Sequence, residues 1–207
     1  RGAILYYDVN YRASHRNEVM RITPNLIENL EFADIVRGSN EDFEVIYKLN
    51  DADKVYHSEI SFYCKNFICT RGKDPISVHA EGNFHKDYDI ESLKTVSTIG
   101  AGDTFNAGII YSLLRQHITR DDIQNGLTEA QWDRLIASGK AFSAECCKDI
   151  YNYVGKEFGL LKKQELWLYG DNFGKIQRLS SVLRREKRLF NEWKAPLWRD
   201  EHYALKR

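Results

Sequence analysis

One short run of glycines followed by an acid offers the clearest chemistry in the sequence. Gly100, Ala101, Gly102 and Asp103 stand between an extended segment and an amphipathic helix expected over 103–116. Glycines let the backbone approach an anion closely, and the amides of such a turn add to the positive end of the helix dipole. A carboxylate at the helix start can take a proton from a hydroxyl while those amides hold the charge that develops on a transferred phosphoryl group. A glycine turn capped by an aspartate is the structural alternative, and so short a motif does not decide between the two.

The apolar pattern indicates the elements that would position this turn. Short apolar runs predict strands of a buried sheet, over 3–7, 33–36, 67–70 and 76–80. Segments with helical spacing lie between these runs. Strands that alternate with helices are typical of an α/β domain, so we expect a mainly parallel sheet flanked by helices.

Several helices have recognisable start signals. Thr23 and Pro24 predict a helix start, with the threonine as cap and the proline at the first helical position. Thr128 and Gln131 match a capping box at the start of another helix. Helices are therefore expected from Thr23 onward and over 40–49, 52–63, 103–116 and 128–151.

The composition excludes several classes of partner. Lys and Arg together number 30, as do Asp and Glu, so no overall field favours nucleic acid or an anionic membrane. No apolar run is long enough to span a bilayer. The cysteines have neither zinc nor disulfide spacing, which predicts reduced thiols in a cytoplasmic protein. They are Cys64, Cys69, Cys146 and Cys147. Homo-oligomerisation is left open.

The residue composition of the chain changes near Gly159, where we place a domain boundary between 1–159 and 160–207. Three of the four tryptophans and the basic stretch 184–188 lie beyond it. Basic residues interleaved with aromatics suit binding of RNA or of a partner. The alternatives are an amphipathic helix that packs on the domain, or an unrelated fusion. At the other end, an apolar run begins directly after Arg1, which predicts further chain upstream.

A longer string around the glycine run, residues 98–108, resembles the second signature of the PfkB (ribokinase-like) carbohydrate kinase family, T-x-G-A-G-D-x-F-x-A-G. Further matches follow in the family's order. Asp-Val-Asn-Tyr-Arg at 8–12 is similar to its D-x-N-x-R, and Thr-Arg-Gly-Lys at 70–73 is similar to its T-x-G-x turn. The segments 33–36, 39–41 and 142–144 also match, so the resemblance covers residues 3–158. Members of this kind include 2-keto-3-deoxygluconate kinases and fructokinases.

The resemblance implies a Rossmann-like fold, incomplete at its N-terminus, with ATP and sugar at the carboxyl edge of the sheet. It implies ATP-dependent phosphorylation of a sugar or sugar-acid hydroxyl, with Asp103 as general base. The other roles it implies are an anion hole at Gly100, Ala101 and Gly102, nucleotide binding by Thr70, Gly72 and Ser143, and substrate binding by Asp8, Asn10 and Arg12.

Two positions leave alternatives open. The family's magnesium-linked motif is N-x-x-E, but here Asn40 is followed three residues later by Phe43. Asn40 and Glu41 are therefore the candidates for Mg²⁺, and a solvated acidic helix start is the alternative. Arg12 suits the carboxylate of a sugar acid because its guanidinium is a fixed fork. Its alternative is a pair with Asp8 or with a neighbouring loop.

A second function follows from what the matched region lacks. The family's first signature, its sugar-contacting strands and its lid belong to an N-terminal part that does not match here. The alternative to a kinase is therefore a non-catalytic remnant that retains the fold and at most binds a nucleotide.

Overall fold

A computed structural model of the chain describes residues 2–11, 17–91 and 94–168. The chain divides into two compact units, 1–159 and 160–207. All strands described below belong to the first unit, and α7 (Lys156–Leu168) crosses the division. No helix within the described ranges is both long and apolar enough to cross a membrane.

The first unit is built on a five-stranded sheet with the strands in chain order. The strands are β1 (Tyr6–Asp8), β2 (Ile35–Ser39), β3 (Phe67–Arg71), β4 (Asp74–Ala80) and β5 (Phe84–Tyr88). β1, β2 and β3 pair in parallel, whereas β4 and β5 extend the sheet in antiparallel fashion. Parallel neighbours end at the same edge, so the segments after β1, β2 and β3 meet at one place.

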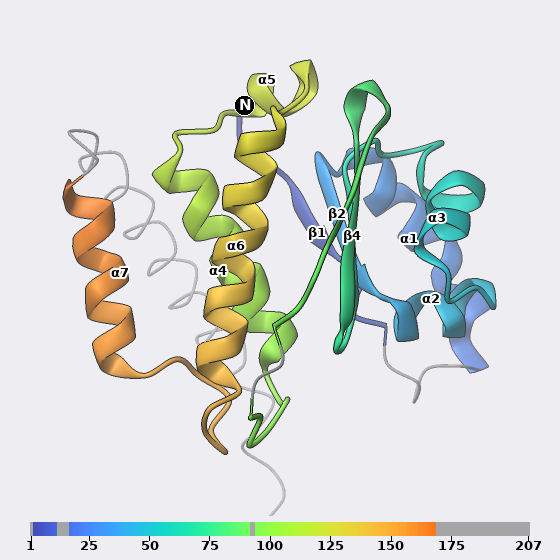
Figure 1. Cartoon of the computed structure of the whole chain (residues 1–207). Coiled ribbons are helices and arrows are strands. Elements are labelled where there is room, and N and C mark those ends of the chain that lie inside the picture. Colours follow the sequence, from blue (N-terminus) through green and yellow to red (C-terminus); the bar gives the residue numbers. More distant parts are fainter. Residues whose placement is uncertain (1, 12–16, 92–93, 169–207) are drawn as a thin grey trace, which may run out of the picture. The chain divides into compact units, whose positions relative to one another are not determined.

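Helices cover both faces of this sheet, as Figure 1 shows. On one face lie α4 (Ala101–Arg115), α5 (Arg120–Asn125) and α6 (Glu129–Cys146). On the other lie α1 (Val19–Phe32), α2 (Asn40–Tyr47) and α3 (Ala52–Val55), which continues into the π-helical turn η2 (Tyr56–Ile60). A short 3-10 turn, η3 (Glu81–Asn83), joins β4 to β5. The α/β architecture expected from the sequence is confirmed.

The two faces hold separate apolar cores because successive strand residues point to opposite sides. Ile35 and Ile68 pack with Trp132 in the core beneath α4 and α6. Their neighbours Val36 and Phe67 belong to the other core, beneath α1, α2 and α3. Each buried aliphatic or aromatic side chain contributes ~1.5–3 kcal/mol, so both cores hold the sheet in place.

Helices α4 and α6 approach closely because glycines face each other across their contact. A Cβ added to Gly108 would lie 2.5 Å from the Ser138 carbonyl oxygen, and one added to Gly139 would lie 2.6 Å from the Phe105 ring. This contact fixes the position of α4, whose first residues carry the glycine run.

The helix starts differ from the sequence expectation in one case. The structure begins α1 at Val19, so Thr23 and Pro24 lie inside the helix and the predicted start is wrong. The Thr23 hydroxyl donates to the Val19 carbonyl, 2.7 Å away, and so serves the helix interior rather than its cap. In contrast, Thr128 caps α6 and forms the expected capping box with Gln131.

Candidate active site

The carboxyl ends of the three parallel strands are tied together by one arginine. Arg37 of β2 is buried, with 8% of its surface exposed. Its Nη1 donates to Asp8 Oδ1 of β1 at 3.0 Å, and its Nη2 donates to Thr70 Oγ1 of β3 at 2.6 Å. A buried charge is tolerated when it is paired and hydrogen-bonded. The Asp8 carboxylate supplies the opposite charge, so the guanidinium is held in one orientation.

The same carboxylate connects the strands to helix α4. Asp8 Oδ2 accepts a hydrogen bond from Asn106 Nδ2 at 2.8 Å, and the Tyr6 hydroxyl donates to Asn106 Oδ1 at 2.9 Å. Burial raises the pKa of Tyr6 well above its usual range, with Asp8 acting in the same direction and Arg37 opposing it. Tyr6 therefore stays protonated and remains a donor, which fixes the orientation of the Asn106 amide.

Helix α4 begins at the glycine run. Gly100 has φ 80°, a left-handed conformation, and a Cβ there would lie 2.9 Å from Asn152 Cβ. No other residue fits this position without strain. The first helical bond runs from the Thr104 amide to the Gly100 carbonyl at 2.9 Å. The amides of Gly102 and Asp103 precede it and, like those of any first helical turn, point out of the helix end.

The positive end of α4 faces the buried guanidinium. A Cβ on Gly102 would lie 3.3 Å from both Nη1 and Nη2 of Arg37, so glycine permits this approach without a shift of the guanidinium. Arg37 Cζ also lies 5.9 Å from the centroid of the Phe105 ring. Asp103 is exposed beside this convergence. Helix amides and a guanidinium are groups that can bind an anion, and an exposed carboxylate is a group that can accept a proton.

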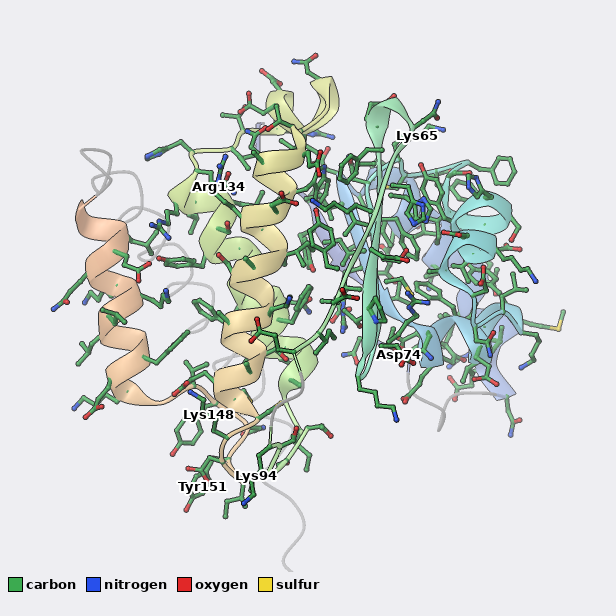
Figure 2. All side chains as sticks on the ribbon, viewed as in Figure 1. Lys65, Asp74, Lys94, Arg134, Lys148 and Tyr151 are labelled. Atoms are coloured by element: carbon green, nitrogen blue, oxygen red, sulfur yellow. The ribbon has the colours of Figure 1, made fainter. Side chains whose placement is uncertain are left out.

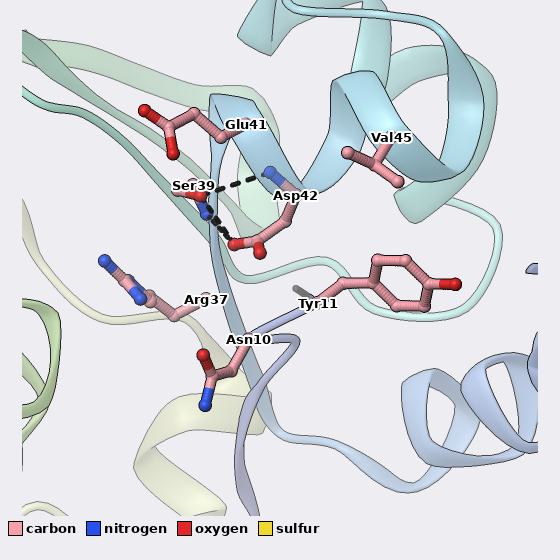
Figure 3. Close-up of a pocket in the computed structure, with 7 residues that line it drawn as sticks. All are labelled: Asn10, Tyr11, Arg37, Ser39, Glu41, Asp42 and Val45. Carbon is pink, nitrogen blue, oxygen red and sulfur yellow. Dashed lines mark hydrogen bonds between the residues drawn. The ribbon is translucent and has the colours of Figure 1, made fainter. Parts of the chain in front are cut away.

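A pocket of about 370 Å³ opens at the same edge of the sheet, and Figure 3 shows its lining. Arg37 lines it together with Asn10, Tyr11, Ser39, Glu41, Asp42 and Val45. Ser39 and Asp42 form a capping box at the start of α2: Ser39 N and Oγ donate to Asp42 Oδ2 at 2.7 and 2.6 Å. The lining is polar along β2 and the start of α2, which suits a ligand with hydroxyl or phosphate groups.

The structure brings several predicted residues to this edge. Arg37 holds Asp8 and Thr70, and it lies against Gly102 at the start of α4. Asn10 lines the pocket.

Other predicted residues make no contact with Arg37 that the structure records, or are not described. Gly72 lies in the exposed β3–β4 turn, and Ser143 lies in α6. Glu41 lines the pocket, whereas Asn40 does not. Arg12 falls outside the described residues.

Two residues of this network were not identified from the sequence: Arg37 and Asn106. Arg37 offered a signal, because a charge directly after the apolar run 33–36 requires a partner if it is buried. Asn106 offered none, since its partners Tyr6 and Asp8 meet it only in the folded arrangement.

Comparison with known proteins identifies the family. The model of the pfkB family carbohydrate kinases matches residues 4–149. A 5-dehydro-2-deoxygluconokinase from Geobacillus thermodenitrificans (strain NG80-2) is 26% identical over 119 residues, 55% of this chain and 35% of that protein.

Solved structures share the fold. The fructokinase from Vibrio cholerae O395, with fructose, ADP and calcium bound, superposes with a TM-score of 0.61 at 17% identity, over 80% of this chain and 50% of that one. The aminoimidazole riboside kinase from Salmonella enterica, complexed with aminoimidazole riboside and an ATP analog, gives 0.60 at 17% identity, over 76% and 51%.

The chain thus spans about half of these solved kinases and about a third of the curated relative. The ribokinase-like fold expected from the motifs is confirmed by these structures. Because the family model extends over most of the first unit, the chain belongs to the pfkB family of carbohydrate kinases.

Proposed function

We propose that this chain contributes the phosphoryl-transfer site of an ATP-dependent kinase acting on a hydroxyl of a sugar or sugar acid. The observation that carries the proposal is the convergence of the α4 N-terminus and the Arg37 guanidinium beside the exposed Asp103. Membership of the family supports sugar phosphorylation as the reaction class.

Asp103 acts as the general base in this proposal. It takes the proton of the acceptor hydroxyl while that oxygen forms a bond to the γ-phosphorus of ATP, and the bond between that phosphorus and the ADP oxygen breaks. The resemblance assigns the anion hole to Gly100, Ala101 and Gly102. Because the Ala101 amide donates to the Thr98 carbonyl at 3.1 Å, we assign the stabilisation of the negative charge on the transferred group to the outward amides of Gly102 and Asp103, with Arg37. The guanidinium does not need to reorganise during the reaction, because Asp8 and Thr70 already hold it.

The nucleotide lies between the β3–β4 turn and α6 in this arrangement. Thr70 and Gly72 border the phosphate end, and Ser143 borders the adenine end. The open surroundings of Gly72, where an added Cβ would meet no atom within 4 Å, leave room for a ligand. Titration with ATP of variants at Thr70 and Ser143 tests this placement.

The acceptor lies in the pocket beside β1 and α2. Asn10 faces it, and Asp8 acts through Arg37 and Asn106 rather than by direct contact. Arg12 is proposed to meet the carboxylate of a sugar acid. If so, Arg12→Lys weakens binding of sugar acids selectively, because lysine lacks the bidentate fork. Equal losses for neutral sugars would argue against it.

Mg²⁺ would bind at the start of α2. Asn40 and Glu41 are the proposed partners, and Glu41 lines the pocket with the further carboxylate Asp42. These are hard oxygen donors of the type that Mg²⁺ prefers, so the residues present fit the ion. Asp42 Oδ2 is engaged by Ser39, which leaves Glu41 as the exposed carboxylate. Bound there, Mg²⁺ would neutralise phosphate charge.

The test is Asp103→Asn, with Asp121→Asn as the matched control because both are exposed acids in the first turn of a helix. A general base supplies ~10²–10⁴-fold in rate. Turnover with ATP and a panel of neutral sugars and sugar acids should fall by that factor for Asp103→Asn only. ATP binding should persist, since it rests on backbone amides. Near-normal turnover in Asp103→Asn would refute the role of Asp103. ATP binding without phosphoryl transfer in the unaltered protein would favour a nucleotide-binding role.

A further inference from the structure

A second cluster of chemically active side chains lies outside the pocket. Asp53 of α3, His79 of β4 and His85 of β5 each offer a ligand atom, and these atoms all lie within 4.8 Å of one another. His79 Nε2 is 2.9 Å from Asp53 Oδ1, and His85 Nε2 is 3.4 Å from the same oxygen. Within the described ranges, it is the one group of three or more His, Cys, Asp or Glu residues with this geometry.

The cluster lies at the end of the sheet where β3 begins, whereas the proposed kinase site lies at the end where β3 finishes. His79 pairs with Phe67 at the beginning of β3, whereas Thr70 lies near the end of that strand. In Figure 2, Lys65 marks the edge where β3 begins and Asp74 marks the edge where the next strand starts. A ligand here would not compete with one held by Arg37.

The sheet register holds the two histidines together. His79 and His85 are directly paired across β4 and β5, so their side chains share a face. Their rings are stacked with centroids 4.3 Å apart, and the Tyr56 ring stacks on His79 with centroids 4.2 Å apart. His79 is buried, with 3% of its surface exposed. The His79 ring is therefore held in place by the Tyr56 ring.

The other two members of the cluster face solvent. The side chains of His85 and Asp53 are 42% and 55% exposed. The ring of His57, at the start of η2, lies edge-on to His79 at 5.7 Å. An ion from solution can therefore reach the cluster, where the buried ring of His79 is already fixed.

Two imidazoles and one carboxylate are the donor set of zinc sites that have three protein ligands and a water. Zn–N and Zn–O distances near 2.0–2.2 Å place tetrahedral ligands ~3.4 Å apart. Asp53 Oδ1 is 3.4 Å from His85 Nε2, which matches this value, and 2.9 Å from His79 Nε2, which is about half an ångström shorter. Imidazole ligands also favour zinc-like ions over Mg²⁺ and Ca²⁺. We propose that Asp53, His79 and His85 bind a divalent transition-metal ion of the zinc type, with water as the fourth ligand.

Binding requires one local movement. A metal lies in the plane of each imidazole that binds it, so two parallel rings cannot share an ion until one of them turns. His85 is the ring that turns, because it is partly exposed on the last strand of the sheet and rotation about its Cβ–Cγ bond is soft. The bound ion would join α3 to β4 and β5.

The experiment uses the protein without a polyhistidine tag, first treated with a chelator and then titrated with Zn²⁺ by calorimetry. Co²⁺ serves as a second probe, since its visible absorption reports tetrahedral coordination. The proposal predicts one ion per chain, and no displacement by millimolar Mg²⁺. Free Zn²⁺ at ~100 times its Kd should raise Tm by about 5–10 °C, because the ion binds the folded chain preferentially.

Variants separate this site from adventitious binding. His85→Gln and Asp53→Asn change exposed side chains, so both should fold, and each should weaken Zn²⁺ binding at least tenfold. His117→Gln, an exposed histidine in the α4–α5 connection, should leave the affinity unchanged. Absence of binding would overturn the proposal, as would equal affinity in all variants. Neither result depends on kinase activity, so the outcome is independent of the proposed function.

Discussion

The contact between α4 and α6 gives a prediction in which two known effects oppose each other. Replacing glycine by alanine inside a helix normally stabilises it, by ~0.8–1.0 kcal/mol in intrinsic propensity. At Gly108 the new Cβ would lie 2.5 Å from the Ser138 carbonyl oxygen and 2.7 Å from Gly139 Cα. Optimal separations between carbon atoms are ~3.5–4.0 Å. The two helices must therefore move apart by about 1 Å or bend.

Overpacking dominates at this position. The atoms that the new methyl meets belong to the backbone of α6, so no side-chain rotation relieves the clash. Forced shifts of this kind cost ~1–3 kcal/mol. Gly108→Ala should therefore lower the free energy of unfolding by up to about 2 kcal/mol after the gain in propensity is subtracted. For a chain of this size, Tm should fall by up to about 8 °C.

Gly159→Ala is the matched control. Gly159 also lies within a helix, α7, but a Cβ there would meet no atom within 4 Å. The substitution should leave Tm unchanged or raise it slightly. Thermal and urea unfolding of both variants beside the unaltered chain provide the measurement. If Gly108→Ala proved as stable as Gly159→Ala, the close approach of α4 and α6 would be wrong.

Three further outcomes follow from the structure. Burial raises the pKa of Cys64 to about 11 and that of Cys69 to about 12, so alkylation of both at pH 8 in the native protein should be far slower than after unfolding; equal rates would contradict their burial. Hydrogen bonding to Lys86 lowers the pKa of Asp133 in the folded chain. The pair therefore stabilises the fold fully at pH values above the pKa that Asp133 has in the unfolded chain, and this stabilisation is lost as the pH falls through the pKa of the folded chain. Asp133→Asn should therefore lower Tm at pH 7, and the loss should shrink as pH falls below the usual carboxyl pKa; a pH-independent loss would argue against the ion pair. Deleting 160–207 should leave the stabilisation by ATP intact, because all motifs with a proposed phosphate or adenine role precede this segment. Loss of that stabilisation in a truncated but still folded chain would show that the domain boundary is wrong.

The parts of the fold that depend on neighbouring residues could be predicted from the sequence. The glycine run, its helix and the capping box at Thr128 are of this kind, since their partners lie within a few positions. β5 was missed because Phe84–Tyr88 has three consecutive polar residues between its aromatic ends, so it contains no apolar run, and it extends the sheet as a partner of β4. The role of Arg37 could not be predicted, because its partners are 29 and 33 residues away and meet it only when three strands align.

The sharing of the Arg37 guanidinium also bears on how the molecule opens. β1, β2 and β3 each contribute to one buried charged group. Opening β1 or β2 locally would leave a charge unpaired in the interior, and opening β3 would remove a hydrogen-bond acceptor of the guanidinium. Hydrogen exchange of the amides in these strands is therefore expected to require a large cooperative opening, whereas β5, an end strand outside this network, is expected to exchange through smaller fluctuations. In many enzymes the reactive groups are borne by the least protected loops. Here the residues that hold Arg37 are expected to be among the slowest-exchanging of the described first unit, so the geometry around Arg37 should persist until that unit unfolds.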